Sequence, residues 1–140
     1  MITKHTFNRE MSIKMAQKHC KLLEHKGCYN NIFKMIAEYK NEFYSGRWKI
    51  AYGYMKAVQN VYVRHCFIVD DLGRAIDPTV VHINRTRDEH DHISFKMLDA
   101  ETYLEILWQN DRLPALDHAF RKEEREMWDY SMQNNIIICG

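Results

Sequence analysis

The stretch VYVRHCFIVDDLGRAID, residues 61–77, contains two strand-like runs joined by residues typical of a turn. In its first nine residues the odd-numbered positions predict one face of a β-strand and the even-numbered positions the other. Asp70-Asp71-Leu72-Gly73 follows, with Asp side chains that bond to nearby main chain and a glycine that tolerates positive φ. The stretch therefore predicts a β-hairpin whose second strand, residues 74–77, is ended by Pro78.

The register of this hairpin decides which side chains meet. If residues 70–72 form a three-residue loop, His65 faces Asp77 directly, with Cβ atoms ~5 Å apart on one face of the sheet. A loop shorter or longer by one residue would place Cys66 opposite Asp77 instead. With the three-residue loop, we expect a hydrogen bond between His65 and Asp77, and we expect Cys66 on the other face. Such a buried pair also occurs in a purely structural role.

Cys28 supplies a thiol that would make His65 and Asp77 part of a catalytic site. It follows Gly27 and opens a segment, residues 28–43, whose apolar spacing predicts a helix. A helix N-terminus and a neighbouring imidazolium both favour the thiolate, which is the reactive form of cysteine. Cys28, His65 and Asp77 therefore supply the residue types of a thiol nucleophile, its imidazole base and an orienting carboxylate. With four cysteines and eight histidines, such an order also arises by chance.

The rest of the chain predicts further helices and strands of one α+β domain, residues 1–140. Helical spacing is found in residues 8–24 and 115–132, and Asp99 is expected to be the N-cap of a helix between them. Alternating patterns predict strands at residues 48–56 and 92–97, and the apolar residues 136–138 predict an edge strand. We expect N-terminal helices packed on a small antiparallel sheet, followed by C-terminal helices.

Composition excludes several classes of protein. The 140 residues include 20 basic and 19 acidic side chains, which gives a net charge of +1. The protein as a whole therefore has no positive electrostatic potential that would attract nucleic acid or an anionic membrane. The N-terminus lacks the apolar core of a secretion signal, and no apolar run approaches the ~20 residues of a membrane span. We expect a cytoplasmic protein with neither nucleic acid nor membrane as a partner.

The cysteines are expected to be free thiols, and no cofactor is expected. Cys20, Cys28, Cys66 and Cys139 lack the paired spacing of common zinc sites. Two metal sites remain as alternatives: one would combine Cys20 and Cys28 with His19 and His25, and the other would combine His82 with residues 88–92.

Four short motifs together resemble the papain-like and transglutaminase-like cysteine enzyme superfamily, in particular its short bacterial and phage members. They are Gly27-Cys28-Tyr29-Asn30-Asn31, Gly53-Tyr54, Arg64-His65-Cys66-Phe67-Ile68-Val69-Asp70 and Gly73-Arg74-Ala75-Ile76-Asp77-Pro78-Thr79. Short members often have His-Ala-Trp where this chain has His65-Cys66-Phe67, a departure that keeps a small residue followed by an aromatic one. The resemblance covers roughly residues 27–79 and says nothing specific about the terminal helices.

The resemblance implies an enzyme that acts on an amide or isopeptide bond of a protein or peptide through a thioester. Cys28 would be the nucleophile, His65 the general base and acid, and Asp77 the carboxylate that orients the imidazole. The Cys28 main-chain N–H would be one oxyanion donor, and Gln17, Asn30 and Tyr54 are candidates for oxyanion or substrate binding. Peptidase, isopeptidase, deamidase and transglutaminase-like activities all fit.

Two alternatives come from other classes of protein. The first is a non-catalytic phage or bacterial binding protein that retains the fold and inhibits a host protein. The second is a small metal-binding domain that uses one of the two clusters described above. Selective reactivity of Cys28 would favour the enzyme over the first alternative, and the metal content of the purified protein would test the second.

Overall fold

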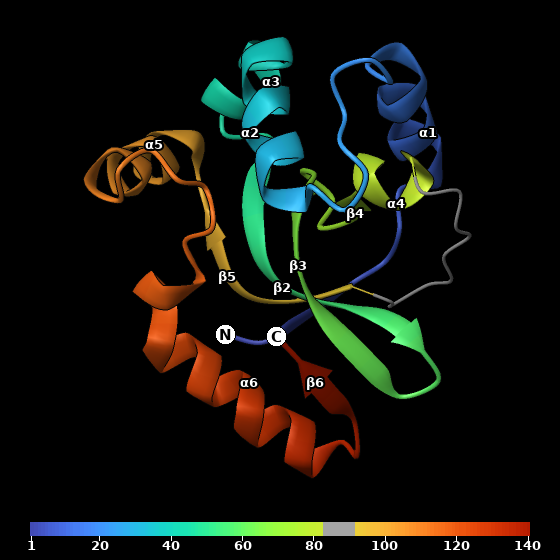
Figure 1. Ribbon diagram of the computed structural model, residues 1–140, viewed down its shortest axis with the longest axis vertical. Helices are drawn as coiled ribbons and strands as arrows, with labels where there is room; N and C mark the ends of the chain where they lie inside the picture. The colour runs from blue at the N-terminus through green and yellow to red at the C-terminus, as the bar shows by residue number, and fades with distance from the viewer. Residues whose placement is uncertain (83–91) are drawn as a thin grey trace.

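Among residues 1–82 and 92–140, which the computed structural model describes, six strands form one mixed sheet with helices packed against it (Figure 1). The strands are β1 (Thr3–His5), β2 (Lys49–Val58), β3 (Val61–Val69), β4 (Ala75–Ile76), β5 (His92–Leu98) and β6 (Ile137–Cys139). The helices are α1 (Arg9–Lys18), α2 (Cys28–Glu38), α3 (Lys40–Tyr44), α4 (Pro78–His82), α5 (Ala100–Gln109), the short 3-10 helix η1 (Asp117–Phe120) and α6 (Arg121–Gln133). The predicted α+β class is confirmed.

Three of the predicted helices are shorter or divided in the structure. The helix predicted at residues 8–24 is only α1, which begins after Asn8, whose side chain accepts the Met11 N–H at 3.1 Å. The helix predicted at residues 28–43 is divided at Tyr39, whose ring packs against Trp48 with centroids 5.2 Å apart. The helix predicted at residues 115–132 begins as η1 and continues as α6.

One helix start is confirmed in atomic detail, and two short elements are additional to the prediction. The Asp99 side chain accepts the N–H of Thr102 at 2.8 Å, so Asp99 is the N-cap of α5 as expected. The additional elements are β1 and α4, each of three to five residues. In the described part of the chain, no helix has the length and apolar character needed to cross a membrane.

The sheet has the order β1-β5-β2-β3-β4, and β6 pairs with β3. Neighbouring strands are antiparallel except for β6, which runs parallel to β3. The prediction of a wholly antiparallel sheet is therefore wrong for this last strand. The chain reaches it after the long helix α6, so the connection is long enough for a parallel strand.

The hairpin between β3 and β4 has a different register from the predicted one. Ile68 pairs with Ile76 and Val69 with Ala75, so the connection has five residues and not three. Asp70 makes the longer loop possible, since its carboxylate accepts the main-chain N–H groups of Leu72 and Arg74. The shift is two residues, which preserves the face of every side chain, and so His65 and Asp77 still lie on the same side.

The two faces of β3 contact different parts of the core. His65 and Phe67 lie on one face, opposite Gly53 and Ala51 of β2, and Phe67 belongs to a small cluster with Ala51, Val69 and Ala75. Cys66 lies on the other face, as predicted, in the main core that also includes Cys28 and the helices.

The outer edge of β3 has a gap in its strand partners. On the side away from β2, β4 pairs with residues 68–69 and β6 with residues 61–63, so residues 64–67 have no strand partner there within the described chain. α2 packs against β3, and Figure 1 shows it crossing in front of this strand. The gap contains His65 and Cys66, so the N-terminus of α2 has access to side chains from both faces of the strand.

Gly53 provides a test of the sheet geometry. A Cβ at this position would lie 1.9 Å from the main-chain oxygen of Ile93, at an irregularity in the pairing of β2 with β5. We expect Gly53→Ala to lower the free energy of unfolding by ~3 kcal/mol or more, because main chain in the middle of a sheet cannot move aside. Urea denaturation measures this change.

The matched control is Gly73→Ala, in the loop between β3 and β4. Gly73 has a φ of +77°, but a Cβ there would meet nothing within 4 Å. This variant should lose only the ~1–2 kcal/mol that a left-handed conformation costs an L-residue. Equal losses in the two variants would contradict the close approach at Gly53.

Candidate active site

Cys28 is the first residue of α2, where the helix leaves main-chain N–H groups without helical partners. Gly27 occupies the N-cap position and has no side chain to accept these N–H groups. The thiol is only 9% exposed and belongs to the same core cluster as Tyr52 and Cys66. Its surroundings therefore combine burial with the positive end of a helix dipole, which favours an anion at this position.

His65 lies on β3 with its ring between Cys28 and Asp77. Its Nε2 is 2.6 Å from Oδ2 of Asp77, and its side chain is nearly buried. Burial alone would lower the pKa of His65, but the charge and hydrogen bond of Asp77 outweigh it, and a hydrogen bond and charge interaction with Cys28 act in the same direction. Together they raise the pKa of His65 to about 10.

Asp77 follows β4 and is fully buried. Its main-chain N–H donates to Oγ of Ser12 on α1 at 3.0 Å, and its Oδ1 accepts the N–H of Val80 in α4 at 3.3 Å. Burial alone would raise the pKa of Asp77, but the charges and hydrogen bonds of His65 and His92 lower it below its ordinary range. The carboxylate is therefore held in place by α1, α4 and two imidazoles.

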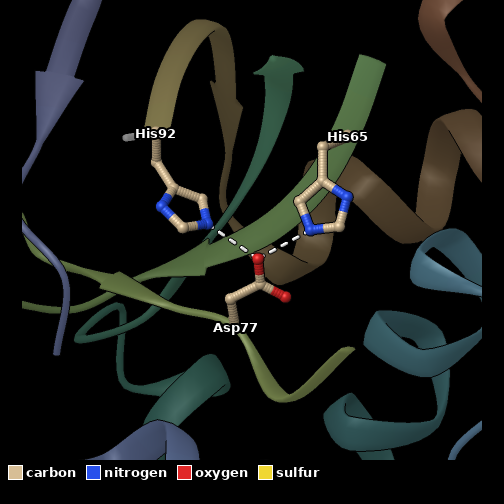
Figure 2. A group of neighbouring side chains, drawn as sticks. All are labelled: His65, Asp77 and His92. Carbon is tan, nitrogen blue, oxygen red and sulfur yellow. Dashed lines mark hydrogen bonds and ion pairs between the residues drawn. The ribbon is translucent and has the colours of Figure 1, made fainter. Parts of the chain in front are cut away.

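His92, at the start of β5, is a member of this site that sequence reasoning missed. Its Nε2 is 2.7 Å from the same Oδ2 of Asp77 that His65 contacts, and its side chain is fully buried (Figure 2). The sequence places His92 at the end of a polar, His-rich stretch that is typical of a solvated loop. Only the pairing of β5 with β2, which places His92 opposite Met55, brings it to the site, so no local signal reveals it.

A cavity of about 340 Å³ opens beside Cys28. One wall is the start of α2, and the other is the connection between α5 and η1; the lining residues are Lys26, Gly27, Cys28, Tyr29, Asn30, Leu113, Pro114 and Ala115. Tyr52 supports both walls, since its hydroxyl donates to the Pro114 oxygen at 2.8 Å and its ring stacks on Tyr29. The cavity is large enough for a substrate side chain, and Tyr52 contacts a residue of each wall.

The three candidates for oxyanion or substrate binding lie in different places. Asn30 is exposed and lines the cavity beside Cys28. Gln17 is exposed on α1, and Tyr54 is buried with its hydroxyl near the Glu124 carboxylate at 3.4 Å; neither of these two lines the cavity. The geometry therefore favours Asn30, since it alone of the three lines this cavity.

One group in the described part of the chain has converging metal-ligand atoms: His65, Asp77 and His92, whose atoms lie within 4.8 Å of one another. The two Nε2 atoms lie 2.6 and 2.7 Å from one oxygen of Asp77, which is the distance of a hydrogen bond. Two ligand atoms bound to the same metal ion lie farther apart than this. The alternative set of His19, Cys20, His25 and Cys28 does not converge. Residues 88–91 and the His82 side chain lie outside the described structure.

No protein-family model, no curated protein and no solved structure matches this chain. The candidate site therefore depends on its own features: a thiol at a helix start, an imidazole whose pKa that thiol helps to raise, and a buried carboxylate shared by two imidazoles.

The cluster predicts how stability depends on pH. The folded-state pKa of His65 is raised, so its contribution is complete below about pH 6.5 and is lost as pH rises toward about 10. The folded-state pKa of Asp77 is lowered, so its contribution is complete above about pH 4 and is lost in stronger acid. The contribution of His65 and Asp77 to the free energy of unfolding should therefore be highest between about pH 4 and 6.5.

Asp77→Asn should lower the free energy of unfolding by ~3–5 kcal/mol at about pH 5, because it removes the charge that two buried imidazoles share. It should also flatten the pH dependence. Urea denaturation at about pH 3, 5 and 9 measures both effects, and Asp71→Asn, at an exposed carboxylate of the neighbouring loop, is the control. Equal behaviour of the two variants would contradict the buried cluster.

Proposed function

We propose that this protein is a cysteine-dependent acyl-transfer enzyme in which Cys28, His65 and Asp77 form the catalytic triad. The observation that carries the proposal is the position of the His65 ring, which bonds to the buried Asp77 carboxylate and belongs to the strand against which α2 packs, the helix that Cys28 begins. Cys28 is also one of the groups that raise the pKa of His65. Nε2 is occupied by Asp77, so Nδ1 is the nitrogen available to the thiol; Figure 2 shows it turned away from Asp77.

The same arrangement supports a place in the papain-like and transglutaminase-like superfamily. The order of nucleophile, imidazole and carboxylate along the chain agrees with that resemblance. So does a cysteine at the start of a helix that packs on a β-sheet bearing the histidine. The Asp-Pro-Thr motif has a structural reason here, since Asp77 ends β4, Pro78 begins α4, and Thr79 accepts the side-chain amide of Asn31 in α2 at 2.9 Å.

The proposed reaction begins with a Cys28 thiolate and a His65 imidazolium. The sulfur attacks the carbonyl carbon of an amide, a C–S bond forms, and the carbonyl electron pair moves to oxygen. The main-chain N–H of Cys28, at the first position of α2, would donate to this oxyanion. When the intermediate collapses, the C–N bond breaks and His65 gives its proton to the leaving nitrogen, so an acyl thioester remains on Cys28.

The second half of the reaction releases the acyl group. His65, now neutral, takes a proton from water or from an amine as that nucleophile attacks the thioester carbon. The C–S bond breaks and the thiolate returns, paired again with imidazolium. Water gives hydrolysis, as in a peptidase, isopeptidase or deamidase, whereas an amine gives transfer to a new amide. The substrate we propose is an amide or isopeptide bond of a protein or peptide, which the cavity beside Cys28 receives.

Acylation by p-nitrophenyl acetate tests the proposal. Mass spectrometry should detect one acetyl group on Cys28, and Cys28→Ala should abolish the adduct and slow release of nitrophenol by ~10³-fold or more. Cys66→Ala is the control, because Cys66 is buried on the other face of β3 and should be dispensable. Thermal unfolding verifies that both variants fold. An acyl group that forms equally well without Cys28 would reject the triad.

Iodoacetamide provides a second test that needs no substrate. At about pH 6 an ordinary thiol is less than ~1% thiolate, so the exposed Cys20 and Cys139 should react slowly. Cys28, although buried, should react faster than either, because the proposal makes it the nucleophile, at a helix start and with His65 as its base. Reaction in the order of exposure alone would favour a non-catalytic binding protein.

A further inference from the structure

The Asp77 carboxylate has one more partner than a triad requires. His65 and His92 both place Nε2 within 2.7 Å of Oδ2. Their side chains are 7% and 0% exposed, so bulk water does not compete for these contacts. In both contacts the imidazole N–H donates and the carboxylate oxygen accepts. One oxygen therefore holds two donors that come from different strands, β3 and β5.

The His92 ring is held rigidly. It stacks on Phe7 with centroids 5.7 Å apart and planes within 5°, and it meets the edge of Phe67 at 4.8 Å. Its strand is paired with β2 on one side and with β1 on the other, where His92 lies opposite His5. A ring fixed by main-chain pairing and by two aromatic contacts can serve as a fixed donor to Asp77.

We infer that His92 is a positioning residue, which fixes Oδ2 of Asp77 through a second imidazole N–H and limits how strongly Asp77 holds His65. This inference rests on the proposed function only for its consequence at Cys28. The geometry of His65, Asp77 and His92 exists whether or not the thiol reacts.

Two donors on one oxygen weaken each other. Each hydrogen bond draws electron density from the carboxylate, so the oxygen that binds both is a poorer acceptor for either. Without His92, Asp77 would stabilise the imidazolium of His65 more strongly. The direction is the same whether His92 is neutral or charged, because both forms compete with His65 for Asp77.

Among the described residues, the ionisable side chains that interact with His65 or His92 include Cys28, Asp77 and His5. Cys28 faces His65 from α2, and Asp77 faces both rings from the end of β4. His5 on β1 interacts with His92, and burial as the main cause lowers the pKa of His5, whose ring bonds to the Gly73 oxygen and to Ser94. The two rings are also direct neighbours, with centroids 6.0 Å apart, and Asp77 is the group to which both bond.

The experiment compares His92→Phe with His92→Gln. Phenylalanine keeps the flat ring and loses the donor, whereas the amide nitrogen of glutamine takes nearly the place of Nε2 and keeps it. The pKa of His65 is measured by NMR of its ring in each variant, in a Cys28→Ala background so that the thiol has no influence. The His65 signal is assigned by its loss in His65→Gln.

We expect His92→Phe to move the pKa of His65 upward and His92→Gln to leave it near the wild-type value. In proteins that retain Cys28, alkylation by iodoacetamide should be ~10-fold slower in His92→Phe, because Asp77 is no longer held, and its upper pH limit should rise. His92→Gln should restore both. If His92→Phe does not fold, His92→Asn replaces it, since its shorter amide does not reach Oδ2.

The outcomes separate the two proposals. If the titration of His65 is unchanged in a folded variant without the donor, or if His92→Gln is as impaired as His92→Phe, His92 is only a core residue and the inference fails. If His65 responds as expected while Cys28 of the wild-type protein has ordinary reactivity, the acyl-transfer function fails and the positioning role of His92 stands.

Discussion

The buried Asp77 carboxylate is the constraint on which the candidate site depends. A carboxylate withdrawn from water is unstable unless donors surround it, and here the donors come from β3, β5 and α4, while its main chain is fixed by α1. None of these elements can move without leaving the charge less well compensated. The cluster therefore joins β3, β5, α4 and α1 through one residue.

The sheet explains why this charge lies next to a cysteine. Within the described residues, β3 has strand partners at both ends of its outer edge but none along residues 64–67, and α2 packs on this strand. His65 bonds to Asp77, and the thiol at the start of the helix is close enough to raise the pKa of His65. A continuous strand partner along this edge would cover it, so the shortness of β4 and β6 is part of how the site is made.

A second polar network supports the cavity from behind. The Tyr29 hydroxyl donates to Asp117 at 2.5 Å, and Arg64 pairs with both Asp117 and Glu124. Tyr29 is next to Cys28 in the chain and lines the cavity, so this network connects α6 and η1 to the mouth of the candidate site. Cys66 is unsuited to be a nucleophile, because burial raises the pKa of its thiol and keeps it neutral.

Local sequence determined the parts of this protein that depend on neighbours in the chain. Strand periodicity, the Asp99 N-cap, the cysteine at a helix start and the shared face of His65 and Asp77 all follow from spacing. The last of these survived an error in the register, because a shift of two residues leaves every side chain on its face. The parallel pairing of β6 with β3 came from contacts between residues far apart in the chain. The division of the helix at Tyr39 accompanies the packing of Tyr39 on Trp48, which follows the helix. The role of His92 depended on tertiary structure. Its position at the junction of a polar stretch and a predicted strand gives no sign of a buried partner, and Asp77 is 15 residues away in the chain. The pairing of β5 with β2 brings the His92 ring to the buried Asp77 carboxylate.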